Sequence, residues 1–84
     1  LSFIFFLFSD NMIYLGNDDF PGVIGAVGAT LGKAGVNIAT MNVGRRDNSA
    51  IMLLTVDSEV EGNALKNLRK LSQIKWAHYL DLKL

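Results

Sequence analysis

The sequence predicts an α+β domain whose elements follow the order strand, helix, strand, strand, helix, strand. Two observations carry this prediction. Two segments have apolar residues at helical spacing, and four shorter runs are either apolar throughout or alternate between apolar and polar residues, which is typical of strands. Residues that favour turns separate these segments. The 84 residues suffice for one domain with a small core, so we expect a partner to stabilise it.

The first strand runs from Met12 to Gly16, and an acidic turn, Asn17 to Phe20, joins it to a helix. Pro21 suits the first helical position, because its φ is fixed near the helical value and it has no N–H to leave unpaired. Asp19 or Phe20 is then expected to cap the helix.

The start of this helix is the candidate binding site. Gly22 has no Cβ, so a ligand could closely approach the backbone amides, which carry the positive end of the helix dipole. A small carboxylate is the group that such a site favours. The alternative interpretation is a strand-to-helix turn without a ligand.

From Pro21 the first helix is predicted to continue over residues 22–34, where apolar residues recur at helical spacing. Gly25, Gly28 and Gly32 lie inside it, and each costs about 1 kcal/mol relative to alanine, so they indicate a close approach of the helix to a sheet or another backbone. They do not form a dinucleotide-binding motif, because the first glycine pair of G-x-G-x-x-G is missing. Gly35 is expected to end the helix. The apolar residues at helical spacing are Val23, Ile24, Val27, Leu31 and Ala34.

Two strands follow. The first covers Val36 to Arg46, and Asp47 to Ser49 forms the turn after it. The second, Ala50 to Val56, is apolar with little interruption, which predicts a central position in the sheet with little exposed on either face.

The second helix is predicted to begin at a capping box, Ser58 to Glu61, and to end near Leu71. From Ile74 onward the residues alternate with a period of two, which indicates a last strand with one face covered. The larger side chains Trp76, His78, Leu80, Leu82 and Leu84 share one phase of this alternation, and we assign the covered face to them.

This order predicts the ferredoxin-like βαββαβ fold, a four-stranded antiparallel sheet with both helices on one face, plus an extra N-terminal strand. We assign residues 11–84 to the domain and residues 1–10 to an N-terminal hydrophobic segment. Leu1 to Phe8 is too short to span a bilayer and lacks the features of a signal peptide. We interpret it as a buried strand or a contact with another subunit or domain, with sequence added by cloning as the alternative. Because the chain begins with Leu1, we expect it to be a piece of a longer polypeptide or a processed product.

Composition excludes several functions. A net charge of zero argues against nucleic-acid binding, and the absence of cysteine excludes thiolate metal sites and a cysteine nucleophile while being compatible with the cytoplasm. The adjacent acids Asp18 and Asp19 and the single histidine, His78, have no metal-ligand spacing, and they form no nucleophile–base pair. We therefore expect no enzyme activity, cofactor or metal in this chain, and neither nucleic acid nor membrane as a partner.

Three stretches together resemble the ACT domain at the C-terminus of D-3-phosphoglycerate dehydrogenases. They are Asn17 to Gly25, Leu31 to Met41, and Val43 to Arg45 followed by Ala50 to Met52. The resemblance is specific, because the acidic turn, the Pro-Gly helix start and the strand after it occur at the spacing of the family, and it extends from Met12 to Leu84. A similar pattern ends the iron–sulfur L-serine dehydratases.

This resemblance implies a regulatory domain that pairs side by side with a second copy into one continuous sheet and binds an amino acid, typically L-serine, where the two copies meet. The Gly22 amide would hold the ligand carboxylate, Asn17 and Asp19 its ammonium group, and Asn37 would reach across from the second copy. Pro21, Val23 and Ile38 complete the implied site. The alternatives are a dimerisation module without a ligand and the regulatory domain of an L-serine dehydratase.

Overall fold

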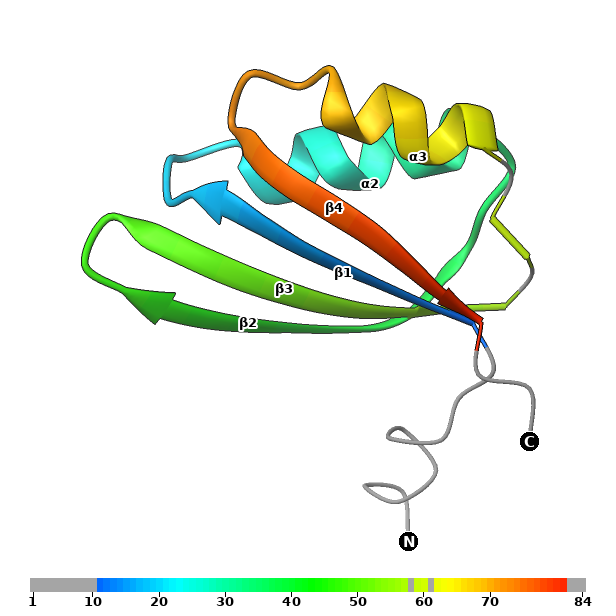
Figure 1. Ribbon diagram of the computed structural model, residues 1–84, viewed down its shortest axis with the longest axis horizontal. Helices are drawn as coiled ribbons and strands as arrows, with labels where there is room; N and C mark the ends of the chain where they lie inside the picture. Colours follow the sequence, from blue (N-terminus) through cyan, green and yellow to red (C-terminus); the bar gives the residue numbers. More distant parts are fainter. Residues whose placement is uncertain (1–10, 58, 61, 82–84) are drawn as a thin grey trace, which may run out of the picture.

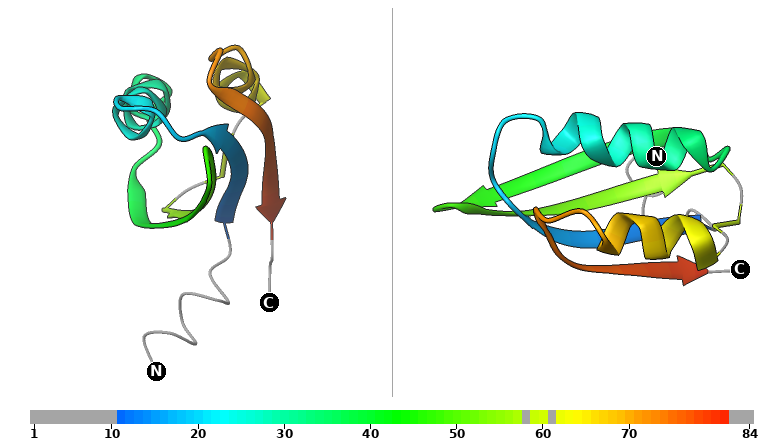
Figure 2. Two further views of the ribbon diagram at one scale, coloured as in Figure 1. Left: turned by 90° about the vertical axis from the view of Figure 1, so that its left-hand side faces the viewer. Right: turned by 90° about the horizontal axis from the view of Figure 1, so that it is seen from above.

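The computed structural model describes residues 11–57, 59–60 and 62–81, and it confirms the predicted βαββαβ order. The four strands form one antiparallel sheet in the order β2-β3-β1-β4, and α2 and α3 both cover the same face of it (Figure 1, Figure 2). The proposed N-terminal strand lies outside the described residues. The elements are β1 Asn11–Asp18, α2 Val23–Lys33, β2 Ile38–Arg46, β3 Ser49–Val56, α3 Gly62–Arg69 and β4 Ile74–Asp81.

The core lies between the helices and the face of the sheet that they cover. Strand pairing places Ile13 beside Leu54 and Leu15 beside both Met52 and Ala77, and all five are buried. The helices contribute apolar side chains to this core, but Ile24 of the predicted α2 stripe is 43% exposed. Burial of apolar area is the main stabilising term of such a domain. The buried helical residues are Val23, Val27, Leu31, Ala64 and Leu68.

Helix α2 begins later than the sequence predicts. Gly22 is its N-cap, with φ of 90°, so Pro21 is not the first helical residue and neither Asp19 nor Phe20 is the cap. The left-handed conformation, which suits glycine, separates the proline from the helix. The predicted end is confirmed: Gly35 has φ of 77°, and its N–H and that of the next residue bond to the carbonyls of Gly32 and Leu31 as in a Schellman motif.

The three glycines inside α2 do not mark a close approach to any other part of the described chain. A Cβ built on any of them has no neighbour within 4 Å. The predicted close approach to the sheet of this chain is therefore wrong, an approach by another molecule stays a prediction, and packing among the described residues does not offset the cost of these glycines.

We expect Gly28→Ala to raise the free energy of unfolding by about 1 kcal/mol, because alanine restricts the unfolded chain and its methyl group meets nothing in the fold. Gly35→Ala should lower it by about 1–2 kcal/mol, because φ is 77° there. Urea denaturation of both variants and the wild type measures the two changes in the free energy of unfolding. A destabilising Gly28→Ala would mean that this face of α2 contacts another molecule.

Strand β4 presents the opposite face from the one predicted. Ala77 is buried under the helices, while Trp76, His78 and Leu80 lie on the outer face of the sheet. The reason is a β-bulge. Asn17 pairs with Ile74 but Gly16 pairs with Trp76, so two residues of β4 oppose one residue of β1. After the bulge, the side chains of β4 therefore alternate in the opposite sense.

Two smaller predictions also need correction. Strand β3 is an inner strand as predicted, but Ile51 on its outer face is 46% exposed, so only the helix side is fully covered. Helix α3 ends at Arg69 rather than near Leu71, and Ser58 and Glu61 of the expected capping box lie outside the described residues. Neither helix of the described chain is long and apolar enough to cross a membrane.

Candidate ligand site at the start of helix α2

The loop between β1 and α2 is held in place by two other loops. The N–H of Asp18 donates to the carbonyl of Gln73 at 2.9 Å, and the N–H of Asp19 donates to the carbonyl of Asn48 at 2.9 Å. Lys75 adds an ion pair, its Nζ lying 3.4 Å from Oδ1 of Asp18. These contacts fix the acidic turn between the β2–β3 turn and the α3–β4 loop.

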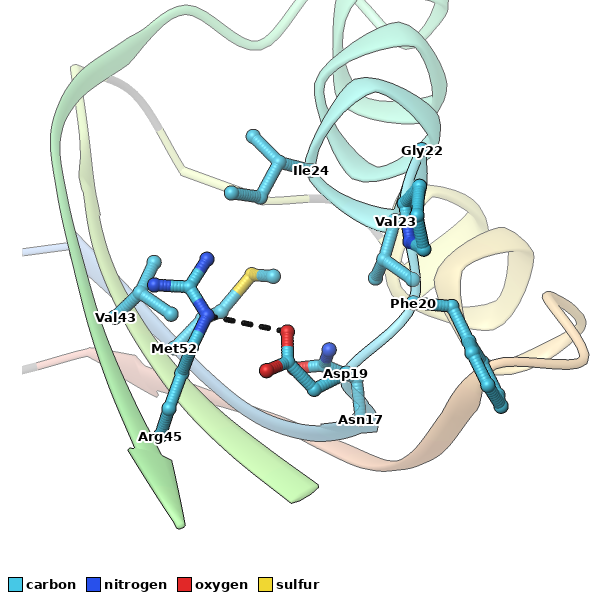
Figure 3. A pocket seen from close by; sticks show the side chains of 10 residues that line it. Asn17, Asp19, Phe20, Gly22, Val23, Ile24, Val43, Arg45 and Met52 are labelled. Atoms are coloured by element: carbon cyan, nitrogen blue, oxygen red, sulfur yellow. Dashed lines mark hydrogen bonds and ion pairs between the residues drawn. The ribbon is translucent and has the colours of Figure 1, made fainter. Parts of the chain in front are cut away.

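A cavity of about 360 Å³ opens beside this loop, at the lower end of the range for small-molecule sites (Figure 3). The loop and the first turn of α2 form one wall, and the ends of β2 and β3 form the other. The loop wall carries two polar side chains, Asn17 and Asp19, among apolar ones, while β2 and β3 contribute apolar side chains and one arginine. The lining residues are Asn17, Asp19, Phe20, Pro21, Gly22, Val23, Ile24, Val43, Arg45 and Met52.

Asn17 is the most buried polar group of this wall, with 1% of its surface exposed. Its Nδ2 donates to the carbonyl of Asp18 at 2.8 Å, which sets the orientation of the amide, because the reverse would bring two acceptors together. Its Oδ1 has no hydrogen-bond partner within the part of the chain that the structure describes. A buried acceptor without a donor costs about 1–3 kcal/mol, so this atom is suited to receive a donor from a ligand.

The first turn of α2 borders the same cavity, and the N–H of Val23 donates to the carbonyl of Phe20 at 3.4 Å. No side chain caps this turn, and it contains no acidic residue. The amides at a helix N-terminus lack partners within the helix and carry its positive dipole end, so this wall favours a negatively charged group. Gly22 and Val23, which begin the helix, both line the cavity.

An ion pair joins the two walls. Nε of Arg45, on β2, donates to Oδ1 of Asp19 at 3.1 Å, and 55% and 29% of these side chains are exposed. Figure 3 shows the Arg45 side chain reaching along the strand wall, with its guanidinium near Val43 and Met52. The cavity therefore contains a cation, an anion, an unpaired acceptor and an uncapped helix start.

Comparison with known proteins identifies the family and supports the fold. A sequence profile described as ACT domain matches residues 11–73. The chain belongs to the ACT domain family.

Relatives of this ACT domain include D-3-phosphoglycerate dehydrogenases from Bacillus subtilis (strain 168), 39% identical over 74 residues, and Methanocaldococcus jannaschii, 41% identical over 66 residues. These matches cover 86% and 76% of this chain but 14% and 13% of the relatives. The chain thus spans a small part of the length of the dehydrogenases that it matches.

Solved structures support the fold. The ACT domain from GTP pyrophosphokinase of Chlorobium tepidum aligns with a TM-score of 0.68 at 18% identity, covering 83% of this chain and 95% of that one. The regulatory subunit of aspartate kinase from Thermus thermophilus aligns with a TM-score of 0.70 at 24% identity, covering 86% and 50%. At these identities, the likeness concerns the fold alone.

Five of the seven residues implied by the sequence line the cavity of the ACT domain: Asn17, Asp19, Pro21, Gly22 and Val23. Asn37 and Ile38 do not, since they lie at the opposite end of β2 from Arg45, and their role in the site of a second copy stays a prediction.

Sequence reasoning missed Arg45, the residue that joins the two walls. The available signal was the alternation of β2, which places position 45 on the same face as Met41 and Val43 and hence on the helix side. It also missed the apolar part of the lining, which comes from Phe20, Ile24, Val43 and Met52.

Proposed function

We propose that this ACT domain binds a free α-amino acid in the cavity at the start of α2 and transmits its binding to the enzyme of which it is a part. The unpaired Oδ1 of Asn17 beside an uncapped helix start is the observation that supports this most directly. The acceptor, with Asp19, matches the ammonium group of an amino acid, and the helix amides match its carboxylate.

The relatives suggest the parent enzyme and the first ligand to test. Because they are D-3-phosphoglycerate dehydrogenases, we propose that the domain regulates such an oxidoreductase, in the cytoplasm, and that L-serine is its ligand. Catalysis would then reside outside this domain. An L-serine dehydratase as the parent enzyme and a dimerisation module without a ligand are the alternatives.

We further propose that two copies pair through their β2 strands. β2 is an edge strand of the sheet and carries Val43 and Arg45 of the cavity wall. Antiparallel pairing about a two-fold axis brings the start of one β2 near the end of the other. Asn37 and Ile38 of the second copy would then lie near Arg45, where an amide side chain could contact the ligand.

Calorimetric titration of the 84-residue chain with L-serine and the other common amino acids tests the function, with light scattering to establish the oligomeric state. We expect a dimer at tens of micromolar and saturable binding of at least one amino acid. A verified dimer that binds none of them at millimolar concentration would favour the dimerisation module. A persistent monomer would contradict the pairing of β2 strands.

A further inference from the structure

We propose that Arg45 binds the ligand carboxylate, and that its ion pair with Asp19 occupies the site until an amino acid replaces both halves of it. This rests on the proposed function. In the structure, Arg45 and Asp19 neutralise each other. In the complex, the ligand ammonium would take the place of the Arg45 guanidinium beside Asp19. The ligand carboxylate would take the place of the Asp19 carboxylate beside Arg45. An amino-acid zwitterion carries both charges on adjacent groups, so it can take both partners at once.

The geometry of the pair leaves Arg45 able to do this. Only Nε contacts Asp19, and within the described part of the chain the two terminal nitrogens make no hydrogen bond. A guanidinium binds a carboxylate most strongly through two parallel N–H groups, and Arg45 retains donors for such a contact. Its side chain lines the same cavity as the first turn of α2, so one ligand carboxylate can accept from both.

The ion pair can also be broken at little cost. Both side chains are partly exposed, and pairs of this kind contribute little to stability because water and salt screen them. The ligand would contact the same two charges, but it would satisfy both of them at once beside the strand wall formed by Val43 and Met52. Exchange of partners therefore favours the bound state once an ammonium and a carboxylate arrive together.

The exchange links the ligand to the edge of the sheet. Asp19 belongs to the loop before α2, and Arg45 belongs to β2, which lies at the edge. Without ligand, the side chains of loop and strand are joined directly, and with ligand they are joined through the amino acid. This places the ligand-dependent contact on the strand that we propose for dimer pairing.

A carboxylate-deletion experiment tests the role of Arg45. The 84-residue chain and its variants are titrated with L-serine and L-serinamide, and with L-alanine and L-alaninamide, which lack the hydroxyl group. The amides keep the ammonium group but have no carboxylate. We expect Arg45→Gln to lower the affinity for the amino acids about tenfold or more, because a charge-assisted contact is lost. Its affinity for the amides should be unchanged or higher, because the variant has no positive charge at this position to repel them.

Arg46→Gln is the matched control. Arg46 is the adjacent arginine, but it faces the outer side of the sheet opposite Ser49 and does not line the cavity. This variant should bind both ligand classes as the wild type does. Arg45→Lys keeps the charge without the planar fork and should give an intermediate affinity for the amino acids.

Three outcomes would overturn the inference. If Arg45→Gln binds the amino acids as tightly as the wild type, Arg45 does not hold the carboxylate, although the proposed function stands. If Arg45→Gln weakens the amino acids and their amides equally, Arg45 acts on the shape of the site rather than on the carboxylate. If the wild type binds no amino acid, the proposed function fails together with the inference.

Discussion

Replacing Asn17 with leucine will weaken amino-acid binding about 10- to 150-fold and at the same time stabilise the domain. The two side chains have the same branched arrangement of heavy atoms, and although leucine is larger, Asn17 borders the cavity, which can take up the added volume. Removing the unpaired Oδ1 gains about 1–3 kcal/mol, and losing the Nδ2 bond to the Asp18 carbonyl costs about 1 kcal/mol. That carbonyl keeps its bond from the N–H of Phe20. We therefore expect a net stabilisation of about 1 kcal/mol.

The effect on binding should be larger and of opposite sign. A hydrogen bond from the ligand ammonium to Oδ1 is charge-assisted, and losing one typically costs about 1.5–3 kcal/mol, so affinity should fall about 10- to 150-fold. Urea denaturation and calorimetric titration of the same preparation measure both quantities. An Asn17→Leu variant that binds as the wild type does would show that this acceptor has no part in the site.

Thr55→Val is the control for this experiment. Thr55 is the other buried polar residue of the described chain, but it lies on the outer face of the sheet and its hydroxyl is paired with that of Thr40. Removing a paired hydroxyl should lower stability by about 1 kcal/mol and leave ligand binding unchanged. The contrast between a satisfied and an unsatisfied buried polar group separates a structural role from a binding role.

The polar half of the candidate site could be predicted because it is contiguous in sequence. Asn17, Asp19 and Gly22 lie within six consecutive residues at the junction of β1 and α2, and glycine and acidic residues just before a helix are a signal that can be recognised from neighbouring positions alone. Arg45 is 26 positions from Asp19, and their contact depends on which strand pairs with which and in what register. A short motif specifies neither the pairing of the strands nor their register. Arg45 could therefore be assigned to the site only once the fold was known.

The fold could be predicted from the periodicity of apolar residues. The errors in the covered face of β4 and the start of α2 arose where single residues interrupt that periodicity. The βαββαβ order needs only the apolar spacing of six segments. The covered face of β4 was assigned wrongly, because a bulge beside Lys75 shifts the phase without any proline or glycine in β4 to signal it. The start of α2 was also predicted too early. Pro21 suggested that the helix begins there, but Gly22 is the N-cap and the helix begins after it.

The outer face of the sheet contains a second position at which one residue has a large effect. Gly16 on β1 lies opposite Trp76, and a Cβ built on Gly16 would be 2.5 Å from the indole ring. The ring also contacts Tyr14 at a centroid distance of 4.8 Å and is stacked with His78 at 5.7 Å. The indole therefore covers the glycine backbone and holds the outer aromatic residues together.

Gly16→Ala should destabilise the domain by about 1–3 kcal/mol, because the methyl group displaces the ring from these contacts. Trp76 is the single tryptophan of the chain, so its fluorescence reports the displacement directly. We expect the emission to shift to longer wavelength as the ring moves into water, and the urea midpoint to fall in parallel.

A double-mutant cycle with Trp76→Leu distinguishes this clash from a general intolerance of side chains at position 16. In the Trp76→Leu background the ring is absent, and alanine is favoured over glycine in a strand by about 0.5–1 kcal/mol, so Gly16→Ala should then be neutral or stabilising. The coupling between the two positions should thus be at least about 1 kcal/mol. Equal destabilisation by Gly16→Ala in both backgrounds would locate the constraint in the β1 backbone beside the bulge rather than in the indole.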